Sequence, residues 1–323
     1  MRTIMSVVRR ILPAAACLAA GIFIGAEGER LSTLFRCRIR EVTFSGPKHH
    51  ALVGRVYQPR GLPGRRYPAI LFVHGLLPKG KDTPLYVHLM RRLARKGYLV
   101  FAFDLGGFGE SGKAANYNIP RDCDFTRDTE AALSYMLRHL PVDRTRLAVA
   151  GHSMGANLAV AVGAKDERVG RIIAISPGNF METVGPESEG TSPLQRRFQR
   201  TVQCEITREQ WERIKGPLNI FRYLPLRSSA QVLLIVAEAD AANIIAYSAR
   251  FHDRLEVPKR FVSIPDVNHN FGFDILSAEE MLEPAGVIRL ARAIDKWMAA
   301  PSIGRGGREG APESAPPLDR GGR

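Results

Sequence analysis

The chain has 323 residues, 45% of them hydrophobic and 24% charged, a composition that can build a large core and excludes wholesale disorder. Beyond position 30 there is no apolar run of about 20 residues, and the four cysteines lack C-x-x-C spacing, which excludes a multi-span membrane protein, a zinc ribbon and a disulfide scaffold. The net charge is +14, but the basic residues are spread along the chain, without the clustered charge and exposed aromatics of a nucleic-acid module, so we expect no nucleic-acid partner.

The first 30 residues have the pattern of an export signal, with three arginines ahead of an apolar run over residues 11–26. A helix of that run spans about 24 Å, short of a hydrocarbon core of about 30 Å, which favours a cleaved signal peptide. A cut after Ala26 would leave Ile24 where a small residue is preferred, so an N-terminal membrane anchor stays open. In either case we expect an exported protein, either periplasmic or secreted, or associated with a membrane through this segment.

From residue 35 to residue 300, strand-like apolar segments alternate with segments of helical periodicity. The predicted strands are residues 38–44, 51–57, 67–73, 98–103, 146–150, 171–176, 231–237 and 261–264. The predicted helices cover residues 86–94, 128–140, 287–298 and a segment from 154 onward. This alternation predicts an α/β fold with a mostly parallel central sheet and helices on both faces.

One connection between two of these predicted strands is unusually long. The segment that precedes the strand at 231–237 has about 50 residues, far more than the usual few. It holds helical patches at 194–206 and 208–214, separated by proline and glycine, which predicts a helical cap inserted at about residues 178–229. Residues 301–323 have almost no apolar side chains, and we expect them to form a disordered tail.

The pentad Gly151-His152-Ser153-Met154-Gly155 lies between a predicted strand and an alanine-rich predicted helix. In G-x-S-x-G at such a strand-to-helix turn, the backbone leaves no room for a Cβ at the glycines. The serine is strained, with its hydroxyl exposed at the sheet edge. Ser153 is therefore the candidate nucleophile. The alternative interpretation is a turn serine with no chemical role.

A serine hydroxyl needs a base to take its proton, and the base needs a partner that fixes its tautomer. Where G-x-S-x-G forms such a strand-to-helix turn, called the nucleophile elbow, the catalytic residues follow in the chain order Ser, then Asp or Glu, then His. Asp240 follows the strand at 231–237 and His269 follows the last short strand, so both should reach the same rim of the sheet. Of the eight histidines, only His269 lies on a late loop in this order. Glu238 and Asp266 stay open as alternatives for the acid.

Acyl transfer also needs donors for an oxyanion. The backbone N–H of Met154, directly after the candidate nucleophile, is one, and that of Leu76, in the H-G-L-L segment after the third strand, is the second. We expect His74 to hold this loop by hydrogen bonds. The glycine-rich residues 104–111 lack the G-K-[ST] of a phosphate-binding loop and the spacing of a dinucleotide fold, and we interpret them as a loop beside the site. No metal and no organic cofactor is predicted.

Together these motifs resemble the α/β-hydrolase superfamily of serine hydrolases, over residues 35–300. The resemblance rests on H-G at His74, D-L-G-G-F-G-E-S from Asp104, G-H-S-M-G around Ser153, the acid Asp240 and the base His269. It implies an esterase-like or lipase-like enzyme with its cap between the sixth and seventh strands. Ala237 departs from the pattern, because many relatives have glycine before the acid loop.

We therefore expect a serine hydrolase that cleaves a small-molecule or lipid-like carboxylic ester through an acyl-enzyme. Ser153 would attack, His269 would carry the proton and Asp240 would orient His269. Apolar cap side chains should line an acyl pocket or form the core of the cap: Phe180, Met181, Phe198, Trp211, Ile220, Phe221 and Leu224. The same triad could serve a peptidase, a lactonase or a thioesterase. The alternative from another class is a catalytically silent binding protein on this fold.

Overall fold

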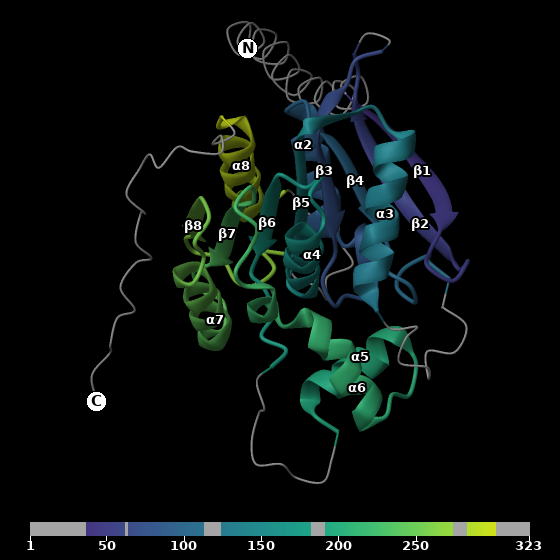
Figure 1. Ribbon diagram of the computed structural model, residues 1–323, viewed down its shortest axis with the longest axis vertical. Helices are drawn as coiled ribbons and strands as arrows, with labels where there is room; N and C mark the ends of the chain where they lie inside the picture. Colours follow the sequence, from purple (N-terminus) through teal and green to yellow (C-terminus); the bar gives the residue numbers. More distant parts are fainter. Residues whose placement is uncertain (1–36, 62–63, 113–123, 182–190, 274–282, 302–323) are drawn as a thin grey trace, which may run out of the picture.

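The computed structural model describes residues 37–61, 64–112, 124–181, 191–273 and 283–301. Within them, eight strands form one sheet in the order β1-β2-β4-β3-β5-β6-β7-β8 (Figure 1). The strands are β1 (Cys37–Ser45), β2 (Ala51–Pro59), β3 (Tyr67–Val73), β4 (Leu99–Phe103), β5 (Val142–His152), β6 (Arg171–Ile175), β7 (Gln231–Ala237) and β8 (Lys259–Ile264). Strand β2 is antiparallel to both neighbours, and all other pairs are parallel. The predicted α/β fold with a mostly parallel sheet is confirmed.

Helices cover both faces of this sheet, which explains why its central strands are apolar on both sides. The main helices are α2 (Pro84–Arg95), α3 (Phe125–His139), α4 (Met154–Lys165), α7 (Ala242–Asp253) and α8 (Ala285–Ala299). Leu71 of β3 packs in the layer that contains α3, α4 and α7, whereas its neighbour Phe72 packs in the layer that contains α2 and α8. In Figure 1, α3 and α4 lie in front of the sheet.

Two boundaries differ from the predicted ones because polar or irregular residues take part in the elements. Helix α3 begins at Phe125 rather than residue 128, since the side chain of Asp124 caps it by accepting from Thr126 N–H. Strand β5 begins at Val142 rather than residue 146. Val142 pairs with Tyr67, and the register of the two strands shifts after this pair. Because polar residues follow Val142, no apolar run marks this start of the strand in the sequence.

The connection between β6 and β7 carries helices α5 (Pro193–Val202) and α6 (Arg208–Lys215) and two short 3-10 turns, η3 (Gly216–Leu218) and η4 (Ile220–Tyr223). Figure 1 shows α5 and α6 as a group below the sheet. The helix predicted over 194–206 is shorter in the structure. It stops at Val202 because Gln203 takes the left-handed conformation, with φ of 52°.

The structure does not describe the segments expected to form the export signal and most of the disordered tail. Residues 1–30, expected to be a signal peptide or anchor, lie outside the described residues, as do residues 302–323 of the expected tail. Among the helices that the structure describes, none has the length and apolar character needed to cross a membrane.

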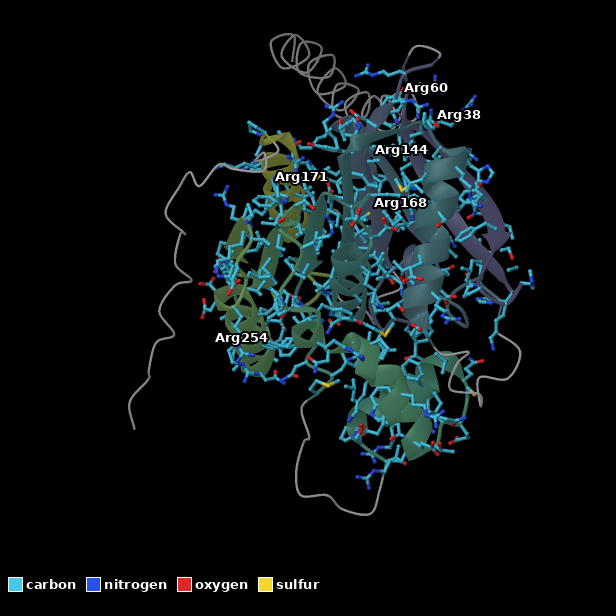
Figure 2. The ribbon with its side chains drawn as sticks, viewed as in Figure 1. Arg38, Arg60, Arg144, Arg168, Arg171 and Arg254 are labelled. Carbon is cyan, nitrogen blue, oxygen red and sulfur yellow. The ribbon has the colours of Figure 1, made fainter. Side chains whose placement is uncertain are left out.

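Basic side chains are dispersed over the described part of the molecule. Figure 2 shows Arg38 and Arg60 at one end of the view and Arg254, beside α7, toward the opposite end. Several others are paired with acids: Arg92 contacts Glu283, and Lys96 contacts Asp295 at 2.6 Å. The labelled arginines thus lie in separate parts of this view.

Candidate active site

The turn that carries Ser153 is the most constrained part of the site. Ser153 joins β5 to α4 with φ of 53° and ψ of −121°, a conformation that L residues rarely adopt. A Cβ added to Gly151 would lie 2.0 Å from the carbonyl oxygen of Gly155, and one added to Gly155 would lie 2.1 Å from that of Val73. Only glycine fits at either position. The backbone N–H of Ser153 donates to Ile175 O at 2.9 Å, which holds the turn against β6.

Asp240 and His269 lie together although 29 positions separate them. The Nδ1 atom of His269 is 2.8 Å and 3.0 Å from the two carboxylate oxygens of Asp240. The carboxylate can only accept, so Nδ1 carries the proton and Nε2 is the nitrogen available to act as a base. Among the described residues no hydrogen bond joins Nε2 to the hydroxyl of Ser153, so that contact belongs to the proposal made below.

Burial and hydrogen bonding act in opposite directions on Asp240. Its side chain is 1% exposed, and burial acts to raise the pKa of the carboxyl. The hydrogen bond to His269 and the charge of that ring outweigh burial and hold the pKa of Asp240 below its ordinary value. Asp240 is therefore ionised at neutral pH and can stabilise a positive charge on His269.

The two alternative acids lie elsewhere. The carboxylate of Glu238 accepts from the backbone N–H of Asp266 at 3.1 Å, and both side chains are exposed. Asp266 takes a positive φ of 56° and shapes the turn that leads to His269. Neither carboxylate contacts the imidazole of His269. Of the three acids considered from the sequence, the structure brings Asp240 to the histidine.

Residues 74–77, called the oxyanion loop after the role predicted for Leu76, lie directly against the elbow. A Cβ on Gly75 would meet the Cβ of Ser153 at 3.1 Å. In this loop Gly75 N–H donates to the hydroxyl of Tyr86 at 3.0 Å, and Leu77 N–H donates to Gly75 O at 2.8 Å. Leu76, the residue between these two donors in the sequence, follows the glycine that lies against Ser153. Met154 is the first residue of α4, where backbone N–H groups have no partner within the helix.

His74 holds this loop from inside. Its ring is fully buried, its Nδ1 donates to Gly75 O at 2.7 Å, and its Nε2 accepts from Leu105 N–H at 3.0 Å. Burial lowers the pKa of His74, so the ring stays neutral and keeps Nε2 as an acceptor. His74 thereby connects the oxyanion loop to the glycine-rich loop that starts at Asp104.

A cluster of acids near the glycine-rich loop is occupied by a lysine. Asp82, Asp104 and Glu110 each place an oxygen within 4.8 Å of the others. The ammonium of Lys81, which is 1% exposed, donates to all three of them, at 2.9 Å to Asp82 and 3.0 Å to Asp104. Lys81 thus sits where a cation would bind, and the cluster is a structural support of the loop.

Asn157, on the first turns of α4, ties the elbow to the cap. Its amide nitrogen donates to Gly178 O at 2.8 Å and to Leu218 O at 2.6 Å, and its oxygen accepts from Gly178 N–H at 2.9 Å. Asn157 is fully buried. The residues that follow each partner, Asn179 and Asn219, both line the same pocket. The pocket therefore begins one residue beyond the contacts of the elbow helix.

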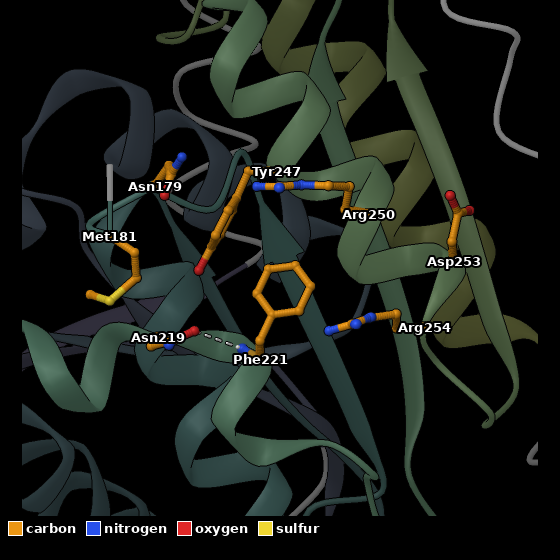
Figure 3. A pocket seen from close by; sticks show the side chains of 8 residues that line it. All are labelled: Asn179, Met181, Asn219, Phe221, Tyr247, Arg250, Asp253 and Arg254. Atoms are coloured by element: carbon orange, nitrogen blue, oxygen red, sulfur yellow. Dashed lines mark hydrogen bonds between the residues drawn. The ribbon is translucent and has the colours of Figure 1, made fainter. Parts of the chain in front are cut away.

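This pocket has a volume of about 770 Å³ and lies between the cap and α7 (Figure 3). Its lining residues are Asn179, Met181, Asn219, Phe221, Tyr247, Arg250, Asp253 and Arg254. The guanidinium groups of Arg250 and Arg254 lie 5.9 Å and 5.7 Å from the ring centre of Phe221. Of the cap side chains expected to line a pocket, Met181 and Phe221 do so. The expected cap residues Phe180, Phe198, Trp211 and Ile220 are buried in the core, and Leu224 is partly buried against it.

Sequence reasoning missed the part of the site built on Tyr86, His152 and Asn157. Tyr86 has the helical spacing of a core residue, and His152 is the variable position of the pentad. Asn157 is a polar residue in an otherwise apolar helix segment, the one local signal that could have marked it as buried with partners.

The strand order, the glycine-flanked serine and the Asp240–His269 pair give this chain the architecture of the α/β-hydrolase fold. The family model described as "Serine aminopeptidase, S33" matches residues 65–217, from β3 into the cap.

Curated relatives of the chain are distant. An uncharacterised protein of Pseudomonas aeruginosa is 26% identical over 175 residues, which cover 54% of this chain and 45% of that protein. One of Mycobacterium tuberculosis is 27% identical over 204 residues, 63% of each chain. The probable lysophospholipase BODYGUARD 5 of Arabidopsis thaliana is 28% identical over 122 residues, 37% of this chain and 26% of that protein. The chain thus spans less than two thirds of the length of these relatives.

Solved structures share the fold over most of both chains. The esterase Est22 has a TM-score of 0.60 at 16% identity, covering 81% of this chain and 81% of its own. Est1E of Butyrivibrio proteoclasticus, solved with ferulic acid bound, has a TM-score of 0.59 at 15% identity, covering 80% of this chain and 97% of its own. At these identities the likeness is one of fold.

Proposed function

We propose that this protein is a serine hydrolase that cleaves carboxylic esters through an acyl-enzyme, with Ser153, His269 and Asp240 as its triad. The observation that carries the proposal is the pair of 2.8 Å and 3.0 Å contacts between His269 and Asp240, beside a serine held in a strained turn. Those contacts fix the tautomer that a general base needs.

In the proposed reaction the Oγ atom of Ser153 attacks the ester carbonyl while Nε2 of His269 takes its proton. The backbone N–H groups of Leu76 and Met154 donate to the oxyanion that forms. His269 then gives the proton to the leaving alcohol, which leaves an acyl group on Ser153. Water, activated by the same nitrogen, releases the carboxylic acid. Asp240 remains ionised and stabilises the imidazolium in both steps.

The comparisons differ on the type of bond that the protein would cleave. Esterases among the structural neighbours support an ester, whereas the family model describes an aminopeptidase. The triad would serve a peptidase, lactonase or thioesterase equally well. A panel of chromogenic esters, aminoacyl anilides, lactones and thioesters would rank these activities, and we expect the highest kcat/KM on esters.

Covalent labelling tests the triad itself. A fluorophosphonate probe should label the wild-type protein on Ser153 and leave Ser153→Ala unlabelled. His269→Ala and Asp240→Ala should label far more slowly. A folded wild-type protein that takes up no label would support the silent binding protein instead.

The pocket of Figure 3 is where we propose that part of the substrate binds, because Asn157 connects its two asparagines to the elbow helix. Its two arginines favour a substrate with a negatively charged group at a distance from the ester. A lipid-like substrate would place its acidic head group there.

Export is proposed from the pattern of residues 1–30 alone. Fractionation of cells that express the full chain, beside a variant lacking residues 2–26, tests it. We expect the full chain outside the cytoplasm and the shortened one within it.

A further inference from the structure

The ring of His152 is buried and both of its nitrogens have partners. The hydroxyl of Tyr86 lies 2.8 Å from Nδ1, and the carbonyl oxygen of His269 lies 2.9 Å from Nε2. A carbonyl oxygen can only accept, so Nε2 carries the proton and Nδ1 accepts from the Tyr86 hydroxyl. The direction of both hydrogen bonds is therefore determined.

Tyr86 extends this line to the oxyanion loop. The backbone N–H of Gly75 donates to its hydroxyl oxygen at 3.0 Å, while the hydroxyl proton goes to His152. One continuous line of hydrogen bonds thus runs from Gly75 through Tyr86 and His152 to the backbone of His269. It joins three regions that lie far apart in the sequence: the segment from the oxyanion loop to α2, the elbow, and the loop that carries the proposed base.

We propose that His152 and Tyr86 are positioning residues, which hold the backbones of His269 and Gly75 so that the base and the oxyanion donor face Ser153 together. The inference rests on the proposed function of Ser153 and His269. Asp240 orients the ring of His269 from one side, and His152 holds its backbone carbonyl from another. The rings of His152 and His269 also lie in contact, with centres 4.7 Å apart.

His152 performs this role as a neutral ring. Burial first, and then the nearby charge of His269, lower the pKa of His152 to about 3. The other titratable or charged groups that face it are Tyr86 of α2, Asp240 and, from the cap, Arg197. A neutral His152 keeps Nδ1 as an acceptor and adds no positive charge beside the imidazolium that forms on His269.

Two substitutions at position 152 separate positioning from packing. Glutamine has an acceptor oxygen and a donor nitrogen that can replace those of a neutral imidazole, whereas phenylalanine keeps a ring and removes both. On the ester that the wild type cleaves best, we expect His152→Phe to lower kcat about 10- to 100-fold with KM within about 3-fold. His152→Gln should recover kcat to within about 5-fold of wild type.

Tyr86→Phe tests whether the two residues act as one line. It keeps the ring packed against Phe72 and removes the hydroxyl. We expect kcat to fall about 10-fold, and we expect the Tyr86→Phe/His152→Phe double variant to be no slower than His152→Phe alone, because both changes interrupt the same connection. Losses that multiply in the double variant would contradict a shared line.

His252→Phe is the matched control. His252 is another buried histidine, on α7, and it has no part in the proposed site. The His252→Phe variant should change the melting temperature and leave kcat unchanged.

Failure of the wild type to label with the fluorophosphonate would overturn the proposed function first. A labelled wild type together with a folded His152→Phe variant at full kcat would overturn the positioning role alone, as would equal losses in His152→Phe and His152→Gln. If His152→Phe does not fold, His152→Gln and Tyr86→Phe carry the test.

Discussion

Gly75 and Ser153 approach each other so closely that a Cβ at position 75 would lie 3.1 Å from the Cβ of the serine. The same added atom would lie 3.0 Å from the hydroxyl of Tyr86 and 3.1 Å from His152 O. Gly75 is therefore enclosed by two atoms of the elbow and by the hydroxyl of Tyr86 on α2, and a Cβ added at Gly75 must displace at least one of them.

Gly75→Ala should consequently lower activity more than stability. The neighbours must give by a few tenths of an ångström, which moves Leu76 N–H relative to Ser153. We expect kcat to fall about 10-fold or more, at a loss of about 1–3 kcal/mol in unfolding free energy. Steady-state kinetics and urea denaturation check both. Gly170→Ala, where the added Cβ would be 3.9 Å from its nearest neighbour, should leave kcat unchanged.

Asp240→Asn should remove the charge that fixes the His269 tautomer while keeping the shape of the side chain. In serine triads this change lowers kcat about 10⁴-fold, and we expect a loss of about 10³- to 10⁴-fold here. Glu238→Gln and Asp266→Asn are the controls, since neither side chain contacts His269, and each should stay within about 2-fold of wild type. A large loss in Glu238→Gln with none in Asp240→Asn would assign the acid to Glu238.

Acid should destabilise the fold partly through His152. The pKa of His152 is about 3 in the folded protein, mainly because of burial, against 6.5 as its ordinary value. Below pH 6.5 the unfolded chain therefore binds a proton that the folded chain does not, so unfolding free energy falls as the pH falls toward about 3. Between pH 6.5 and pH 4 the unfolding free energy of the His152→Gln variant should fall by about 3 kcal/mol less than that of the wild type. Urea denaturation at a series of pH values measures this, and identical slopes in the two proteins would refute it.

Asn157→Ala should loosen the cap. It leaves the buried N–H and O of Gly178 and the O of Leu218 without their side-chain partner. We expect unfolding free energy to fall by about 2–4 kcal/mol and proteolytic cleavage within the cap to become faster. Gln199→Ala, which removes a hydrogen bond to the exposed Glu205, should change stability by less than about 0.5 kcal/mol. Equal effects of the two changes would contradict a role for Asn157 at the cap.

Arg250 and Arg254 should set a preference for negatively charged substrates. With matched esters that differ by a distal carboxylate or its amide, we expect Arg250→Gln/Arg254→Gln to lower kcat/KM about 5- to 10-fold on the carboxylate ester only. The preference of the wild type should also weaken at high salt. Arg222→Gln is the control, because it removes a cap arginine that does not line the pocket. An equal loss on both esters would contradict recognition of the negative charge, and no loss on either would place the pocket outside substrate recognition.

Much of the fold follows from short stretches of sequence. The bounds of β3 and β7 are those predicted, since an uninterrupted apolar run leaves few alternatives to a strand buried on both faces. The elbow is likewise local: Gly151 and Gly155 are required by contacts within the turn itself and with β3. Where polar residues take part in an element, as at the Asp124 cap of α3, the apolar pattern marked the boundary too late.

By itself, then, the sequence determined the order of the strands and helices, the turn at Ser153 and the set of residues able to serve as base and acid, because these depend on local sterics and periodicity. Only the tertiary structure decided that Asp240 rather than Glu238 lies against His269, since the path of two loops directs those side chains. It also gave Tyr86 and His152 a shared line of hydrogen bonds. Apolar spacing cannot predict such a line, because a tyrosine in a core position looks the same whether or not its hydroxyl has a partner.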